Sequence, residues 1–141
     1  MPLLRGTRYA IMAGWSGGPD QVFIFAGQSN ARSFQVTTVP AELEAPHPRT
    51  KIWNIQTQAW ETYEAGVNSD TVQAGQTVYG PEGEFARLWR SANPGGTAYI
   101  IKYAVDSSSL ETDGSPDWDP DHAELFSLAK AEIVAALAQL P

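Results

Sequence analysis

Two predominantly apolar runs stand out along the chain, the second of them interrupted by Lys102. They cover residues 22–26 and 97–105, and consist mainly of β-branched and aromatic side chains. Such runs, bounded by glycine and polar residues, are typical of strands that are buried on both faces in a parallel sheet. Between residues 51 and 63, apolar and polar positions alternate on either side of a polar centre, which predicts a hairpin or two short edge strands.

Two further segments have the period of an amphipathic helix. Pro81 suits a first helical turn, Glu82 and Glu84 favour the positive end of a helix dipole, and apolar residues recur at i, i+3, i+4 and i+7 across residues 85–92. Residues 122–140 are rich in Ala, Leu, Glu and Lys and place their apolar side chains on one face, which predicts a long terminal helix.

The order strand, helix, strand, helix predicts right-handed crossovers and a parallel sheet. With 141 residues, of which 43% are hydrophobic, the chain can bury a core, and we expect residues 1–141 to form a single domain. Only two core strands are predicted, so the pattern is that of about half of a doubly wound α/β domain.

Charge and composition exclude several kinds of partner and metal site. The formal net charge is −7 and no Lys/Arg-rich run occurs, so we expect neither nucleic acid nor a membrane surface as a partner. No apolar stretch approaches the roughly 20 residues that a membrane span needs, residues 1–18 lack the pattern of a signal peptide, and localisation stays open. The absence of cysteine, with only His47 and His122, excludes Cys-ligated zinc and a His-rich metal site. We expect no metal and no cofactor.

The first predicted strand ends at a turn, residues 27–30, with the sequence Gly-Gln-Ser-Asn. Ligands of open α/β sheets bind at the carboxyl ends of the strands, and hydrolytic enzymes of this class display a nucleophile there. Ser29 is therefore the candidate nucleophile. The alternative is that Ser29 caps the helix that follows the turn, because serine is a favoured cap.

Three segments carry a family resemblance. Residues 25–30 read Phe-Ala-Gly-Gln-Ser-Asn, residues 79–82 read Tyr-Gly-Pro-Glu, and residues 101–105 read Ile-Lys-Tyr-Ala-Val. In this order they resemble blocks of the SGNH/GDSL hydrolases, in the sialate O-acetylesterase and acetylxylan esterase branch, over roughly residues 20–140. The resemblance implies a flavodoxin-like, three-layer α/β/α fold with a parallel central sheet, of which this chain holds about half. It also implies a serine esterase that hydrolyses acetyl esters on sugars.

The same resemblance implies roles around Ser29. The Ser29 backbone N–H would be one oxyanion donor, and the second would come from a Gly-Gly pair after the second strand, where this chain has Asp106 and Ser107. Ser107 replaces a glycine that tolerates positive φ, and the Asp106 carboxylate would oppose a nearby oxyanion. For Asp106 we favour the alternative of a solvated loop acid or Asx turn. The expected oxyanion and substrate residues are Gly27, Gln28, Asn30, Gly80 and Ser107.

The family continues after its terminal helix with a strand bearing Gln-Gly-Glu and later an Asp-x-x-His block that supplies acid and base. This sequence ends at Pro141, directly after the predicted helix. Residues 119–122 read Asp-Pro-Asp-His, but they precede that helix, and helix N-terminal polarity accounts for His122. Because removal of triad partners costs orders of magnitude in rate, we expect negligible esterase turnover by this chain alone.

Three functions remain open. The first is a serine esterase by descent, acting on an acetylated carbohydrate or a related small ester. The second is a non-catalytic carbohydrate-binding or assembly module derived from that scaffold. The third is one half of a split enzyme, which would self-associate or bind a complementing chain through the unpaired far edge of the second strand.

Aromatic and acidic residues suggest two weaker sites. Four aromatic residues could stack on a sugar, although core or edge-strand packing is the commoner role: Trp53, Trp60, Tyr63 and Tyr79. Asp117, Asp119 and Asp121 hint at calcium but lack the Gly and Glu of an EF-hand loop, so a solvated acidic loop is favoured. His47, in a Pro-bounded loop, is interpreted as a surface residue.

Overall fold

A computed structural model of the 141-residue chain describes residues 20–32, 38–69, 72, 78–110, 116–121 and 124–141. In chain order its elements are β1 (Gln21–Gly27), α1 (Ser29–Arg32), α2 (Ala41–Glu44), β2 (Thr50–Asn54), β3 (Ala59–Thr62), α3 (Pro81–Ala92), β4 (Ala98–Ala104) and α4 (Glu124–Ala138). Both core strands, the hairpin β2–β3 and both long helices were predicted from the sequence. Within the described residues, no helix has the length and apolar character that crossing a membrane requires.

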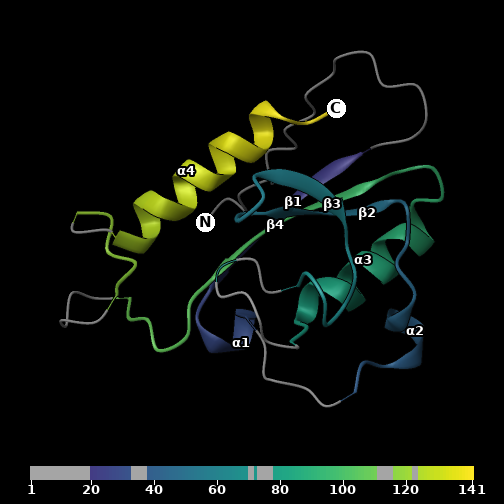
Figure 1. The fold of residues 1–141 in the computed structure, drawn as a ribbon, viewed down its shortest axis with the longest axis horizontal. Coiled ribbons are helices and arrows are strands. Elements are labelled where there is room, and N and C mark those ends of the chain that lie inside the picture. The colour runs from purple at the N-terminus through teal and green to yellow at the C-terminus, as the bar shows by residue number, and fades with distance from the viewer. Residues whose placement is uncertain (1–19, 33–37, 70–71, 73–77, 111–115, 122–123) are drawn as a thin grey trace, which may run out of the picture.

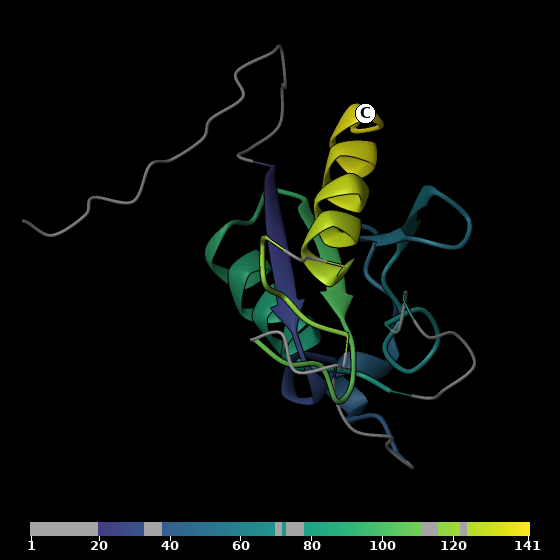
Figure 2. The same ribbon diagram turned by 90° about the vertical axis from the view of Figure 1, so that its left-hand side faces the viewer.

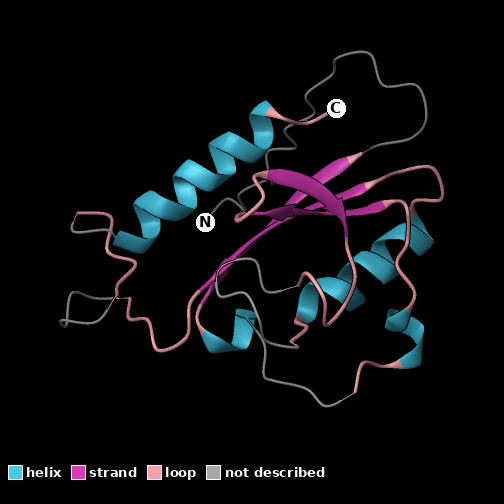
Figure 3. Cartoon of the chain, in the orientation of Figure 1, coloured by secondary structure: helices cyan, strands magenta, loops and turns pink. Residues whose placement is uncertain are grey.

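The four strands form one mixed sheet, which Figure 3 shows in magenta. Their order in the sheet is β1-β4-β2-β3. β4 is parallel to both β1 and β2, whereas β3 is antiparallel to β2. The prediction of a parallel sheet therefore holds for three strands, and the hairpin makes the sheet mixed. The prediction that the second core strand has an unpaired far edge is wrong, because β2 occupies that edge of β4. Among the described strands, β3 ends the sheet on that side and β1 ends it on the other.

The strand register separates two edges of the sheet. Gln21 and Thr50 are both aligned with Ala98 at the amino ends, and Gly27 is aligned with Ala104 at the carboxyl ends of β1 and β4. Ser29 follows Gly27 and therefore emerges at the carboxyl edge. Because a strand advances about 3.3 Å per residue, the amino and carboxyl ends of β1 lie roughly 20 Å apart.

Helices cover both faces of the sheet (Figures 1 and 2). On one face, Ile52 and Ile100 pack with Ala86 and Trp89 of α3. On the other, Trp53 and Ile101 pack with residues of α4 that include Ala136. Neighbouring residues of one strand thus point to opposite faces, and both faces are buried. This arrangement explains the predominantly apolar runs and confirms the α/β class.

Candidate active site

The turn between β1 and α1 presents Ser29. Gly27 has a φ of +145°, a conformation that residues with a side chain rarely adopt, and a Cβ there would lie 3.2 Å from that of Ala31. The Gln28 carbonyl accepts the N–H groups of Ala31 and Arg32 at 2.8 and 3.0 Å, so the helix begins at once. Gln28 holds the capping position and Ser29 is the first helical residue, so the alternative that Ser29 caps the helix does not describe the structure.

The loop after β4 meets this turn. The Val105 N–H donates to the Gly27 carbonyl at 3.0 Å, which ties the carboxyl ends of the two strands together. Two residues further on, Ser107 has a φ of +56°, in the left-handed region that favours glycine. The serine therefore adopts the backbone conformation expected of the glycine that it replaces in the family pattern, at a cost of about 1 kcal/mol.

Asp106 forms an ion pair with Arg32, the last residue of α1. The Arg32 side chain is almost fully buried, and the Asp106 side chain is 38% exposed. Asp106 is thus a partly exposed loop acid, as predicted, but the prediction missed its ion pair, which supplies the counterion that a buried guanidinium needs. The pair joins α1 to the loop after β4 and balances the carboxylate charge beside the predicted oxyanion donor, Ser107.

A second, fully buried ion pair supports α1 from behind. The Lys102 Nζ on β4 donates to the Arg32 carbonyl at 2.7 Å and to Glu82 Oε1 at 2.9 Å. The same Glu82 oxygen accepts the Gly80 N–H at 3.0 Å and the Tyr63 hydroxyl at 3.3 Å. Burial, together with the Glu82 charge, raises the pKa of Tyr63, so its hydroxyl stays a neutral donor.

Gly80 belongs to this buried support. A Cβ at Gly80 would collide with the Glu82 carboxylate and would lie 3.0 Å from Lys102 Nζ and 3.1 Å from the Ala31 carbonyl. The Gly-Pro-Glu segment therefore brings a carboxylate beneath α1. Gly80 does not line the pocket at the carboxyl end of β1. Its contact with substrate stays a prediction, and its position gives that prediction no support.

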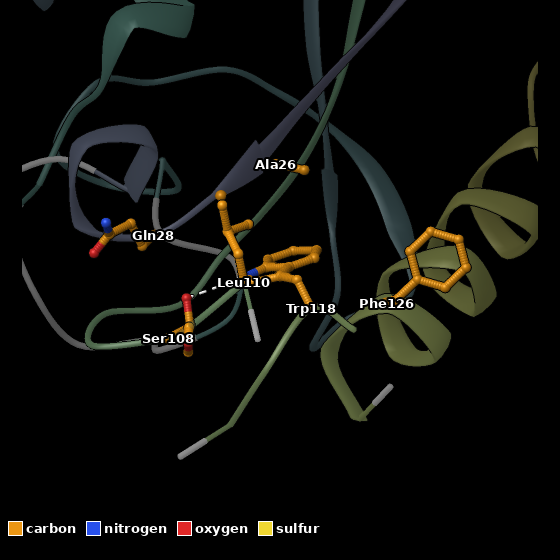
Figure 4. Close-up of a pocket in the computed structure, with 8 residues that line it drawn as sticks. Ala26, Gln28, Ser108, Leu110, Trp118 and Phe126 are labelled. Atoms are coloured by element: carbon orange, nitrogen blue, oxygen red, sulfur yellow. Dashed lines mark hydrogen bonds between the residues drawn. The ribbon is translucent and has the colours of Figure 1, made fainter. Parts of the chain in front are cut away.

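A pocket of about 660 Å³ opens at the carboxyl end of β1 (Figure 4). Its lining residues are Ala26, Gly27, Gln28, Ser108, Ser109, Leu110, Trp118 and Phe126. The Trp118 indole N–H donates to Ser108 Oγ at 3.0 Å, and that hydroxyl donates to the Val105 carbonyl at 2.8 Å, which fixes one polar wall. In Figure 4 the Gln28 side chain points away from Trp118 and Phe126. Ser29 directly follows the lining residue Gln28, but it is not itself among the lining residues. Asn30, the next residue, is exposed.

No hydrogen bond joins the Ser29 hydroxyl to an imidazole or a carboxylate within the described part of the chain. His122 lies outside the described residues. His47 precedes Thr50 by three residues and thus lies at the amino edge of the sheet, far from Ser29. Its Nδ1 accepts the Arg49 N–H at 3.1 Å, and its pKa is lowered by burial and by the charges of Arg90 and Arg49. His47 cannot act as the base for Ser29 in this arrangement.

The four aromatic residues suggested as a sugar platform have structural roles. The indole N–H of Trp53 donates to Glu132 at 2.9 Å and that of Trp60 donates to the Ala136 carbonyl at 3.1 Å, so both rings hold α4 on the sheet. Tyr63 and Tyr79 pack in the core on the α3 face. Packing, and not a sugar platform, describes these aromatic residues.

The aspartates of the predicted acidic loop accept local backbone N–H groups. Asp117 Oδ1 accepts the Asp119 N–H at 3.1 Å, and Asp119 Oδ1 accepts the Asp121 N–H at 2.9 Å. Asp117 is buried, so the loop is only partly solvated. Over the described residues, no group of three His, Cys, Asp or Glu side chains is placed to hold a metal ion.

Sequence reasoning missed the two buried cations beneath the candidate nucleophile, Arg32 and Lys102. A signal for Lys102 was present, since a lysine inside an apolar strand is almost never buried without a partner. Glu82 was interpreted through the helix dipole and as part of the Gly-Pro-Glu segment, whereas the structure pairs its side chain with Lys102.

Comparisons with known proteins agree with this architecture. An X-ray structure of a protein from Arabidopsis thaliana matches with a TM-score of 0.65 and 16% identity, over 83% of this chain and 51% of that one. This chain therefore spans about half the length of that relative, and the likeness shows a shared fold. No curated protein sequence matches. The family described as carbohydrate esterase, sialic acid-specific acetylesterase, matches residues 19–138. Because this match spans most of the sequence, the chain belongs to that family of carbohydrate esterases.

Proposed function

We propose that the chain carries the nucleophile of a carbohydrate O-acetylesterase and that Ser29 is this nucleophile. The observation that carries the proposal is the β1–α1 turn, in which the positive φ of Gly27 leads directly to a half-buried serine at the carboxyl edge of the sheet. Membership of a carbohydrate esterase family supplies the reaction class. A serine at the carboxyl end of a parallel strand supports this role, because ligands of open α/β sheets bind at those ends.

The proposed reaction is ordinary acyl transfer. Ser29 Oγ attacks the carbonyl carbon of an acetyl ester on a sugar hydroxyl while a base removes its proton. The tetrahedral intermediate then expels the sugar oxygen, which takes up a proton and leaves an acetyl group on Ser29. Attack by water releases acetate and restores the hydroxyl.

The backbone N–H groups of Ser29 and Ser107 are the proposed oxyanion donors. The left-handed backbone at Ser107 supports this role, because the family pattern has glycine there. The Asp106 carboxylate is balanced by Arg32, which lessens its repulsion of a developing negative charge. The same turn contains the other proposed substrate residues, Gly27, Gln28 and Asn30. The pocket has an apolar wall that suits the acetyl methyl or a sugar face and is formed by Ala26, Trp118 and Phe126.

The base and its orienting acid are proposed to come from a complementing segment or chain. The solved relative contains about twice the length that this chain matches, and the family resemblance places an Asp-x-x-His block after the part that is present here. In this proposal the chain forms about half of a three-layer SGNH domain. Without a base, a serine hydroxyl has ordinary reactivity.

The test uses 4-nitrophenyl acetate as the probe, with acetylation of the protein followed by peptide mass spectrometry. The chain alone is expected to turn over negligibly, whereas added imidazole is expected to speed acetylation of Ser29. Ser29→Ala should abolish this acetylation. Ser91→Ala is the matched control, since its exposed hydroxyl on α3 bonds only the Arg87 carbonyl. Acetylation of Ser29 that is no faster than acetylation of Ser91 would overturn the proposal.

A further inference from the structure

One side of the pocket comes from a strongly acidic stretch of the chain. Five of the eight lining residues lie between residues 103 and 129. This stretch contains seven aspartates and glutamates but no lysine or arginine, and none of the lining residues is itself charged. A ligand in the pocket is therefore close to an excess of carboxylates.

The two cations beneath the candidate nucleophile are already used. Arg32 forms an ion pair with Asp106, and Lys102 forms one with Glu82. The side chains of Arg32 and Lys102 are only 4% and 2% exposed. Neither cation can therefore turn toward a carboxylate of a ligand without breaking a buried ion pair, which is costly.

The amino end of α4 lies in the same stretch, and acidic groups already meet its positive dipole. Its first turn contains Glu124, and the Leu125 N–H donates to the Asp117 carbonyl at 3.2 Å. The next lysine along the helix is Lys130, which is exposed and lies one turn beyond Phe126. The formal charge of residues 103–130 is −6, since one lysine offsets only one of the seven carboxylates.

Two aromatic side chains form an apolar surface in this pocket (Figure 4). The Trp118 N–H donates to Ser108 Oγ at 3.0 Å, and the Tyr103 ring packs nearly perpendicular to the indole at a centroid distance of 6.0 Å. These two contacts fix the indole. Phe126, on α4, is 45% exposed. Flat apolar rings suit the C–H face of a pyranose, which binds by burial of apolar surface and needs no charge.

We propose that this pocket takes a neutral O-acetylated sugar, whose ring lies on Trp118 and Phe126, and that it disfavours sugars that carry a carboxylate. The inference rests on the proposed function, because it concerns the substrate of the same site. It separates this chain from the description of its family, which names sialic acid, an anionic sugar. The acidic stretch belongs to this chain, so it stays beside the pocket whichever segment supplies the base.

The discrimination should depend on salt. Charges act over about 10 Å at 0.1 M salt and about 30 Å at 0.01 M, so carboxylates that do not touch the ligand still repel an anion when little salt is present. A neutral sugar meets no such repulsion, and its affinity should hardly change with salt. The difference between an anionic and a neutral ligand should thus be large at low salt and small at high salt.

The experiment is an NMR titration of the full-length Ser29→Ala variant with two ligands that differ only in charge. They are the methyl glycoside of an O-acetylated sialic acid and the carboxyl methyl ester of the same compound. Without Ser29 no acetyl group can be transferred to that residue, so binding is measured apart from the proposed reaction. The indole N–H signal of Trp118, assigned by its loss in Trp118→Phe, reports on the pocket. A pH of about 7.5 keeps an unperturbed histidine mostly neutral.

The neutral ester should bind at least about fivefold more tightly than the free acid at about 20 mM salt, and the ratio should fall below about twofold at 0.5 M. A free acid that binds as tightly as the ester at low salt would overturn the proposal. Failure of both ligands to bind would overturn it as well. Either result would leave the acetylation of Ser29 by 4-nitrophenyl acetate, which tests the proposed function, unaffected.

Two pairs of variants locate the effect. Phe126→Ala should weaken binding of the ester about fivefold, whereas Leu128→Ala should change it less than about twofold, because Leu128 is 53% exposed on the same helix but does not line the pocket. Asp121→Lys should narrow the low-salt ratio about threefold. Glu42→Lys changes the net charge equally, but from α2 on the α3 face of the sheet, and should leave the ratio unchanged. Equal effects within either pair would contradict the proposal.

Discussion

Replacement of Lys102 by methionine tests whether the buried ion pair supports the candidate nucleophile turn. Lys102 donates to the Arg32 carbonyl at 2.7 Å and to Glu82 Oε1 at 2.9 Å, and both charged side chains are almost fully buried. Lys102→Met keeps the aliphatic stem but leaves the Glu82 carboxylate buried without a cation. Glu82 Oε2 already lacks a hydrogen-bond partner among the described residues, so little is available to compensate.

The expected loss follows from that geometry. Removal of one partner of a buried ion pair costs about 3–5 kcal/mol, and the freed Arg32 carbonyl places the loss in the upper half of that range. With a urea slope of about 2 kcal/mol per molar, the midpoint of unfolding should fall by about 2 M. Lys51→Met is the matched control: Lys51 donates to Thr62 Oγ1 from a half-buried position on β2, and its loss should cost less than about 1 kcal/mol.

The assay is urea unfolding at fixed protein concentration, completed as a double-mutant cycle with Glu82→Gln. Glu82→Gln alone leaves the Lys102 ammonium buried, whereas the double variant leaves a neutral amide that can still accept the Gly80 N–H. The double variant should therefore be more stable than the sum of the two single losses predicts, by at least about 2 kcal/mol. Amide exchange in α1 should rise in Lys102→Met. Additive losses, or a loss below about 1 kcal/mol for Lys102→Met, would show that the pair does not hold the turn.

Three further predictions concern the neighbouring turns and the distant histidine. Gly27→Ala should lower the free energy of unfolding by about 1–3 kcal/mol in urea, because φ is +145° and Ala31 lies close. Ser107→Gly should be neutral or stabilise by up to about 1 kcal/mol, whereas Ser107→Val should destabilise by about 1–2 kcal/mol, as thermal unfolding would show. The folded-state pKa of His47 is lowered, by burial and then by Arg90 and Arg49, so the unfolded chain binds more protons. Stability should therefore fall as the pH drops below 6.5, and His47→Gln should reduce this fall.

The elements of the fold could be predicted from local pattern, but their neighbours in the sheet could not. The run at residues 97–105 is apolar because β4 is buried on both faces between β1 and β2. The alternation at residues 51–63 predicted a hairpin or two short edge strands. The hairpin is present, but only β3 lies at the edge of the sheet, whereas β2 is an interior strand with Ile52 and Trp53 fully buried. Local periodicity shows that a strand exists, whereas its partner depends on contacts between residues far apart in sequence.

Some features of the candidate site could likewise be predicted from adjacent residues, whereas others could not. The position of Ser29 at the end of β1 followed from a strand, a glycine and the residues after it, all adjacent in sequence. The ion pair of Arg32 with Asp106 joins residues 74 positions apart, and nothing local to either residue indicates the other. The left-handed conformation of Ser107 could not be predicted either, because serine, unlike glycine, rarely adopts a positive φ and so gives no sign of one in the sequence.

The contacts that hold α1 bear on how a base could reach Ser29. The Arg32 guanidinium is held by Asp106, the Arg32 carbonyl is held by Lys102, and the Gly27 carbonyl is held by the Val105 N–H. All three partners lie on β4 or directly after it, so β4 and its loop fix the turn from both ends. A catalytic site gains rate when its reacting groups are held in place before the reaction. Since the serine turn is already held by β4, a base for the proposed nucleophile, Ser29, would have to be brought to this fixed position by the segment that carries it.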